Sequence, residues 1–427
     1  MSKLKKVIIA VGAPVLLLLF GSPPGLAANW FKLQGTEPPD AKTVKICGFI
    51  QPTYYNSASD VLPDDDFRKN DFDIRRARLA ARGIVPGTHD RLNYLLMAGF
   101  GRNGTCEDPN GEQSNEVVTT DASVTLNYIK YAHIRLGQFK LPIGNDALQS
   151  IKLHSYIEFS DVYAELLCER YGHDRSVAAF RDIGAQLFGW RRFGMNREYE
   201  AAYAFMVGNG NGINSRDNND NKRVTTKVTL SRIFDNTGGA FQQCLELGGW
   251  YMTGKQSGFT VAPGPVNGAP VEQQAKRGGI ELVAIKDLGK SGSMHFIGES
   301  VWASGWVYAP HFFEGAVPDN IRYYTENTSV DGHGMPHADL RAFGFYLDGG
   351  YRPPVLDKKI EADLRYSYYN PDSGDDLETS VAQDTWTLGA QYIFDEHARF
   401  IVNYEIRNND WNSGIGNRFM AQVTAIF

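Results

Sequence analysis

Several features of other protein classes are missing from this sequence of 427 residues. After residue 28, no apolar run approaches the ~20 residues that a membrane-spanning helix needs, and the mean hydropathy is −0.34. The four cysteines include no C-x-x-C pair, so neither a zinc ribbon nor a haem attachment site is present. There is no basic block, and the formal net charge is −6. These absences exclude a helical membrane protein and a nucleic-acid-binding protein.

Catalytic and metal-binding motifs are missing as well. We find no G-x-S-x-G, no HExxH and no nucleophile-base pairing, so we expect no enzyme activity. Residues 217–220 and 331–337 contain ligand-type side chains without a complete metal-site spacing, so we predict no metal and no cofactor. Cys106 and Cys168 fall in predicted external loops, where an oxidising compartment favours a disulfide; free thiols are the alternative.

The N-terminus is typical of an exported protein. Three lysines within residues 3–6 precede an apolar stretch of about 14 residues, and small residues follow at positions 25–28. This stretch is too short for a membrane-spanning helix. We therefore expect residues 1–28 to be a signal peptide that is removed, and residues 29–42 to be an N-terminal linker.

The remaining chain alternates apolar and polar residues with the period of two that is typical of β-strands. In the last segment, Phe419, Ala421, Val423, Ala425 and Phe427 share one side. With 52 aromatic residues and 44 glycines, this pattern suits an all-β, transmembrane antiparallel β-barrel covering residues 43–427. Sixteen strands are predicted, at residues 43–55, 71–85, 90–101, 121–130, 132–142, 181–192, 198–208, 222–233, 244–254, 278–288, 293–307, 340–352, 359–369, 383–394, 398–408 and 417–427.

The predicted connections alternate in length around the barrel. Turns such as 86–89 and 395–397 are short, whereas loops such as 102–120 and 143–180 are long. Short periplasmic turns and long external loops are typical of β-barrels in the outer membrane of Gram-negative bacteria. The connection 234–243 is longer than the other turns and is the weakest point of the strand count.

Several segments resemble blocks of the phosphate-selective porin O and P family. These are Phe72 to Leu79, Ile134 to Pro142, Arg181 to Gly189, Val207 to Ile213 with residues 217–220, and Arg418 to Phe427. The resemblance implies a sixteen-stranded, homotrimeric outer-membrane porin whose third external loop folds into the pore. Here that loop is 143–180, the longest connection, which is then the constriction loop.

The resemblance also implies anion passage along lumen arginines and lysines. On strand 71–85, alternation places Arg76, Arg78 and Arg82 on the lumen side, where they form either a positive row or a brace that pairs with carboxylates. The predicted pore-lining residues are Arg76, Arg78, Arg82, Arg135, Lys140, Arg170, Arg175 and Arg181.

The constriction loop also carries six acidic residues, which favours a general pore for small polar or anionic solutes over strict phosphate specificity. The alternative function is a structural barrel that encloses or docks a partner such as an electron-transfer cytochrome. Membrane lipid and small ions or solutes are the other expected partners; nucleic acid is not.

Overall fold

The computed structural model describes most of the chain beyond residue 33. The described residues are 34–38, 41–57, 70–100, 106–107, 113–114, 117–167, 180–214, 217, 220–235, 242–259, 270–305, 307–308, 336–337, 341–374, 382–409 and 416–427. The predicted signal peptide therefore lies outside the described residues, as do Cys168, Arg170 and Arg175.

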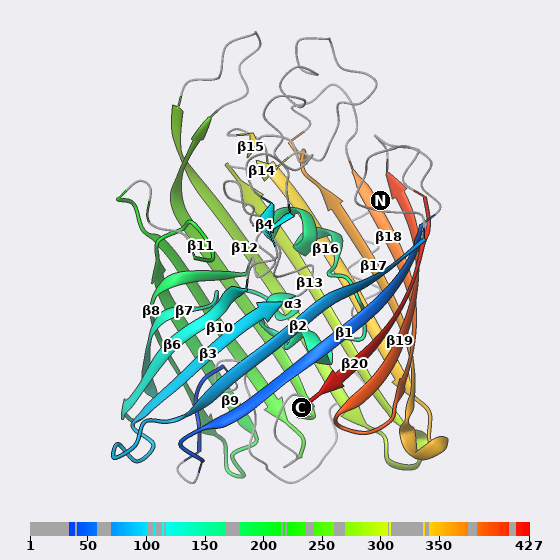
Figure 1. Ribbon diagram of the computed structural model, residues 1–427, viewed down its shortest axis with the longest axis horizontal. Helices are drawn as coiled ribbons and strands as arrows, with labels where there is room; N and C mark the ends of the chain where they lie inside the picture. Colours follow the sequence, from blue (N-terminus) through cyan, green and yellow to red (C-terminus); the bar gives the residue numbers. More distant parts are fainter. Residues whose placement is uncertain are drawn as a thin grey trace.

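Sixteen antiparallel strands form a closed barrel, as predicted (Figure 1). Each strand pairs with its neighbours in chain order, and the first strand pairs with the last. The strands are β1 (Lys45–Ser57), β2 (Asn70–Ile84), β3 (Leu92–Phe100), β6 (Val118–Ile129), β7 (Ala132–Lys140), β8 (Arg181–Phe193), β9 (Tyr199–Gly208), β10 (Arg223–Ile233), β11 (Cys244–Phe259), β12 (Pro270–Asp287), β13 (Ser293–Ser304), β16 (Arg341–Arg352), β17 (Ile360–Asn370), β18 (Gln383–Ile393), β19 (Ala398–Asn409) and β20 (Arg418–Ile426).

The shorter elements lie in the connections. Two small two-stranded sheets pair β4 (Cys106–Glu107) with β5 (Gln113–Ser114), and β14 (Val307–Tyr308) with β15 (Pro336–His337). The helical segments are α3 (Asn145–Leu148), η3 (Ile151–Leu153), η4 (Val162–Leu167), η6 (Gly289–Ser291) and η7 (Leu356–Lys358). Among the described residues, no helix is both long and apolar enough to cross a membrane.

The connection 234–243, the doubtful point of the count, keeps the bounds that the sequence predicts. It joins β10, which ends at Ile233, to β11, which begins at Cys244. The backbone N–H of Phe234 donates to the carbonyl of Gln243 at 3.0 Å, so the connection closes on itself as the pairing of the two strands requires.

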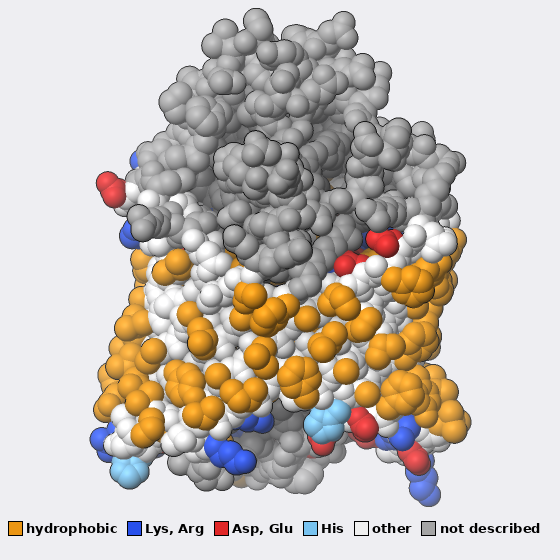
Figure 2. All heavy atoms as spheres, viewed as in Figure 1, with side chains coloured by type: hydrophobic (Ala, Val, Ile, Leu, Met, Phe, Trp, Pro, Cys, Tyr) orange, Lys and Arg blue, Asp and Glu red, His pale blue; other side chains and the backbone are white. Residues whose placement is uncertain are grey.

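Alternation separates the two faces of the barrel wall. Outward-facing apolar side chains remain exposed, and they form a broad band around the visible side of the molecule (Figure 2). Charged side chains gather below this band, near the short turns. Exposed aromatic residues mark the strand ends at that side, for example Tyr131, Phe193, Tyr351, Phe394 and Phe427. An apolar band bordered by aromatic residues matches the hydrocarbon layer and interface of a bilayer.

The seam of the barrel is closed by the last residue of the chain. The backbone N–H of Gly48 donates to the carbonyl of Phe427 at 2.7 Å, and the N–H of Phe427 donates back to Gly48 at 3.0 Å. A Cβ on Gly48 would lie 2.7 Å from the Phe427 ring and 2.4 Å from the carbonyl oxygen of Arg78. Glycine therefore provides the space in which the terminal ring lies against β1.

Candidate functional site in the barrel lumen

The segment after β7 turns into the barrel and crosses its lumen. It contains α3, η3 and η4, and it is described from residue 141 to residue 167. Leu141, Ile143, Val162, Tyr163 and Leu166 are almost fully buried against apolar side chains of the inner wall. Their burial draws the loop into the lumen, because each apolar side chain removed from water contributes about 1.5–3 kcal/mol. Residues 143–167, the described part of the predicted loop 143–180, therefore lie inside the barrel.

Glu299 on β13 holds one end of this loop. Its carboxylate accepts hydrogen bonds from the Tyr163 hydroxyl at 2.8 and 2.9 Å, from Trp250 Nε1 at 2.8 Å and from the Tyr346 hydroxyl at 3.2 Å. Burial, together with the Glu299 carboxylate, holds the pKa of the Tyr163 hydroxyl well above its usual range. The hydroxyl therefore stays protonated and remains a donor.

Glu158 anchors the loop on the other side of the lumen. Arg75 on β2 donates to both carboxylate oxygens, from Nε at 2.9 Å and from a terminal nitrogen at 2.8 Å, and the Tyr55 hydroxyl donates at 3.0 Å. Burial raises the pKa of Glu158, but Arg75 and Arg76 outweigh it, and the resulting pKa lies below the usual range. A bidentate pair of this kind fixes orientation as well as distance.

A β-bulge in β2 places Arg75 in this position. Gln51 of β1 faces Arg76 and the next residue, Pro52, faces Ile74, so Arg75 is the extra residue of the bulge. Phe72 and Ile74 before the bulge are exposed on the outer face, as is Leu79 after it. Arg75 and Arg76 therefore both point inward, although adjacent residues of a regular strand point to opposite faces.

Arg76, Arg78 and Arg82 lie on the lumen side of β2, as alternation predicts, but their contacts differ. Arg76 is buried and donates to the carbonyl of Ile157 in the loop at 3.1 Å. Arg82 pairs with Glu37 of the N-terminal segment and donates to the carbonyl of Thr36 at 3.3 Å. Within the described part of the chain, Arg78 has no ion pair; its guanidinium lies 5.8 Å from the centre of the Phe49 ring.

The expected linker, residues 29–42, contributes to the same wall. In its described part, the Gln34 side chain donates to the carbonyl of Leu148 in α3 at 3.4 Å, and the Glu37 backbone N–H donates to Asn93 Oδ1 at 3.0 Å. Together with the Arg82–Glu37 pair, these contacts place residues 34–37 inside the barrel, beside the constriction loop.

Three more predicted pore-lining residues are buried among protein groups. Arg135 is fully buried, donates to Gln186 Oε1 at 3.2 Å and lies 4.4 Å from the centre of the Phe188 ring. Lys140 Nζ donates to three successive carbonyls, of residues 147, 148 and 149, at 2.7 to 3.2 Å. Arg181 pairs with Asp121 at 3.0 Å. These contacts tie the three side chains to neighbouring strands and to the loop.

The lumen also has a carboxylate-rich region that the sequence analysis did not single out. His295, Asp348, Glu361 and Asp363 meet on β13, β16 and β17, well around the barrel from β2. Alternation alone places Glu361 and Asp363 on the lumen side. The register between the strands, which alternation does not define, brings His295 to them.

The chain belongs to the phosphate-selective porin O and P family, whose model matches residues 45–413. No curated protein matches it. Among solved structures it is similar to OmpF of Salmonella typhi, described in complex with daunomycin, at 12% identity and a TM-score of 0.57, covering 90% of this chain and 97% of that one.

Two further structures are similar over nearly their whole length. The anion-selective porin of Comamonas acidovorans has 14% identity and a TM-score of 0.51, covering 91% of this chain and 100% of that one. The outer-membrane channel DcaP of Acinetobacter baumannii has 14% identity and a TM-score of 0.51, with coverages of 94% and 100%. The family and the shared fold define an outer-membrane channel rather than an enzyme, and they indicate the outer membrane of a Gram-negative bacterium.

Proposed function

We propose that this channel passes small polar or anionic solutes, phosphate-type anions among them, by passive diffusion past the constriction loop. The observation that carries the proposal is the environment of Arg78. Arg78 is partly exposed and, among the described residues, its guanidinium has no carboxylate within ion-pair distance. A charge of this kind on the wall of a narrowed lumen lowers the electrostatic barrier for an anion.

The surroundings of Arg78 support an anion path on this side of the lumen. Arg181, its partner Asp121 and Arg76 all lie close enough to act on Arg78 electrostatically, so cations outnumber the carboxylate around it. Lys152 of the constriction loop lies near Lys45 and Arg82. The positive groups therefore follow the β1–β2 wall toward the short turns, the periplasmic end in this class of barrel. A solute that moves along this wall passes the partly exposed cationic side chains of Arg78 and Lys152.

The alternative of a barrel that encloses an electron-transfer cytochrome receives no support from these contacts. Such a barrel needs an unobstructed lumen, whereas residues 143–167 cross the lumen and are held at Glu299 and Glu158. We further propose that the chain assembles as a homotrimer, and that residues 1–28 are removed on export. The intact mass of the membrane-extracted protein tests the second point, since a mass that includes Met1 contradicts it.

The experiment that tests the anion path is the Arg78→Gln variant in a planar bilayer. The reversal potential in a KCl gradient should shift toward that of a cation-selective pore, and high salt should reduce the shift because the Debye length falls to ~3 Å at 1 M. Arg191→Gln is the matched control, because Arg191 is exposed on the outer face near the short turns. An unchanged reversal potential for Arg78→Gln, at a normal yield of open channels, contradicts the proposal.

A further inference from the structure

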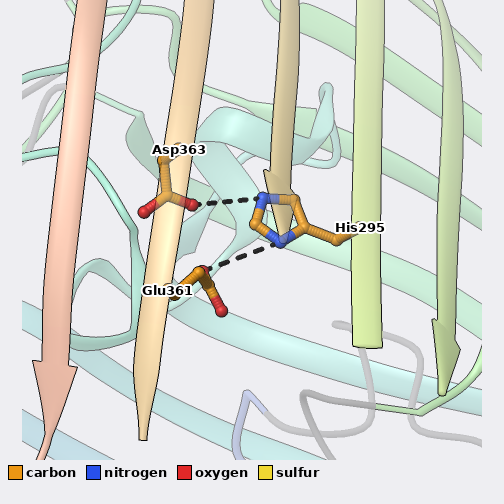
Figure 3. Close-up of side chains that lie close together, drawn as sticks. All are labelled: His295, Glu361 and Asp363. Atoms are coloured by element: carbon orange, nitrogen blue, oxygen red, sulfur yellow. Dashed lines mark ion pairs between the residues drawn. The ribbon is translucent and has the colours of Figure 1, made fainter. Parts of the chain in front are cut away.

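A histidine and three carboxylates converge on the lumen wall near the short-turn end of the barrel. His295 lies two residues after the start of β13, Asp348 lies four residues before the end of β16, and Glu361 and Asp363 lie at the start of β17. Figure 3 shows the His295 ring facing Glu361 and Asp363, with one ring nitrogen toward each side chain. The group is therefore assembled from three neighbouring strands.

The side chains of this group lie close to the two ring nitrogens of His295, of which one can bind a given ion. His295 Nε2 lies 3.3 Å from Asp348 Oδ1 and 3.9 Å from Asp363 Oδ1, while His295 Nδ1 lies 3.7 Å from Glu361 Oε1. One ligand atom from each of His295, Glu361 and Asp363 can be chosen so that all three lie within 4.8 Å of one another.

Glycine at position 350 makes this approach possible. The register places Gly350 opposite His295 on one side and opposite Asp363 on the other. A Cβ on Gly350 would lie 2.2 Å from His295 Cε1 and 2.4 Å from Asp363 Oδ1. The imidazole and the carboxylate therefore lean toward each other over the glycine, and any other residue would separate them.

One buried oxygen in the group has no hydrogen-bond donor in the part of the chain that the structure describes. Asp363 has a fully buried side chain, and among the described residues its Oδ1 atom, which faces His295, accepts no hydrogen bond, whereas Oδ2 lies 3.4 Å from Gln391 Nε2. Leaving a buried carboxylate oxygen without a donor costs free energy. Arg352 pairs with Glu361, and Arg399 lies close enough to act on Glu361 and Asp363, so three carboxylates share two arginines and one histidine in this region. A bound cation would satisfy Asp363 Oδ1 and reduce the excess of negative charge.

We propose that His295, Glu361 and Asp363 bind a divalent transition-metal ion of the Zn²⁺ type in the lumen, with Asp348 beside them. An imidazole nitrogen combined with carboxylate oxygens is a donor set that Zn²⁺ accepts, whereas Mg²⁺ and Ca²⁺ prefer oxygen ligands alone. The ion links three adjacent strands and stabilises this part of the wall. It also changes the charge that a solute meets near the periplasmic mouth.

Binding of Zn²⁺ to the folded, detergent-solubilised protein tests this inference. Isothermal titration calorimetry should give one saturable Zn²⁺ site per chain, and Zn²⁺ should raise the melting temperature, because an ion that binds only the folded state stabilises it. His295→Gln and Asp363→Asn should each weaken binding by at least about 10–100-fold, the range known for loss of mere outer-shell partners. A large excess of Mg²⁺ should leave the bound Zn²⁺ in place.

The matched control is His397→Gln. His397 lies in a short turn at the same end of the barrel, 3.6 Å from Glu396 Oε1, but both side chains are largely exposed. This variant should bind Zn²⁺ as the wild type does.

Gly350→Ala should lose the site without losing a ligand, and heat-modifiable mobility on a gel confirms that it has folded. The inference would be overturned if the wild type showed no saturable Zn²⁺ site. It would also be overturned if His295→Gln and Asp363→Asn bound Zn²⁺ as tightly as the wild type. The measurement needs no open channel, so it stands apart from the test of Arg78.

Discussion

The hydroxyl of Tyr163 and the carboxylate of Glu299 meet in the lumen although they are 136 residues apart in the sequence. The hydroxyl lies 2.8 and 2.9 Å from the two carboxylate oxygens. Gly144 lies against this contact, because a Cβ there would be 1.8 Å from Glu299 Oε1 and 2.1 Å from Tyr163 Oη. Glycine is therefore required at position 144, because any side chain there would overlap the contact between Tyr163 and Glu299.

Removing the Tyr163 hydroxyl should release this end of the loop. Tyr163→Phe loses hydrogen bonds to a buried carboxylate, and we expect a loss of about 1.5–3 kcal/mol in the free energy of unfolding. Gly144→Ala should also lower the free energy of unfolding, because its Cβ would clash with the Glu299 carboxylate. Denaturant titration measures both, with Tyr128→Phe as the control, since Tyr128 is 58% exposed. Wild-type stability of both loop variants would show that the contact does not hold the loop.

Breaking the pair of Arg75 and Glu158 should loosen the other end. Both side chains are partly exposed, at 22% and 15%, so Arg75→Gln should cost about 2 kcal/mol, less than the 3–5 kcal/mol of a fully buried pair. We also expect a larger and noisier single-channel conductance, because the loop gains freedom in the lumen. A double-mutant cycle with Glu158→Gln isolates the interaction. Additive effects of the two changes would mean that they are not coupled.

The shifted pKa values of two loop carboxylates, Asp161 and Glu158, predict how the stability of the protein depends on pH. Burial, with Glu405 nearby and Arg365 opposing, raises the pKa of Asp161 to about 6. The Thr385 hydroxyl donates to Asp161 Oδ1 at 3.2 Å, and the Asp161 backbone N–H donates to Ser367 Oγ at 2.8 Å. A raised pKa in the folded state means that the protein gains stability as Asp161 binds its proton, between pH 6 and its usual pKa of 3.8.

The pKa of Glu158 is lowered instead, so its contribution is present above its usual pKa of 4.5 and is lost as the pH falls below that value. The melting temperature should therefore rise slightly from pH 7 to about pH 5 and fall at more acidic pH. Asp161→Asn should abolish the rise but keep the fall. A variant that still becomes more stable between pH 7 and pH 5 would exclude Asp161 as the cause.

The seam between β1 and β20 should depend on its last residue. Deleting Phe427 removes two backbone hydrogen bonds to Gly48 and an aromatic residue of the interface, so the yield of heat-modifiable, folded barrel should fall sharply. Gly48→Val should have a similar effect, because its side chain would overlap the Phe427 ring. Gly87→Ala is the control. Gly87 lies in a turn with φ +81°, so alanine strains the backbone there, but its Cβ would meet no atom within 4 Å. Normal folding of the deletion variant would mean that the seam closes without Phe427.

Alternation was enough to predict the strands, because each barrel strand faces lipid on one side and the lumen on the other. It failed at Arg75, where the bulge shifts the alternation by one residue. A signal was present: the outer face contains Phe72 and Ile74, then Ala77 and Leu79, so the apolar spacing changes from two to three between residues 74 and 77. The contacts of Arg135, Lys140 and Arg181 could not be predicted, because each depends on a partner from another strand or from the folded loop.

The contacts of the constriction loop have a mechanical consequence for the barrel. Glu299 of β13 holds one part of the loop, while Arg75 of β2 and Asn403 of β19 hold another, the latter accepting from the backbone N–H of Ile157 at 2.8 Å. A cylinder with a cross-member between distant parts of its wall resists flattening along the line of that member. Lateral pressure from the bilayer should therefore deform this cross-section unequally, least along the direction that the loop spans.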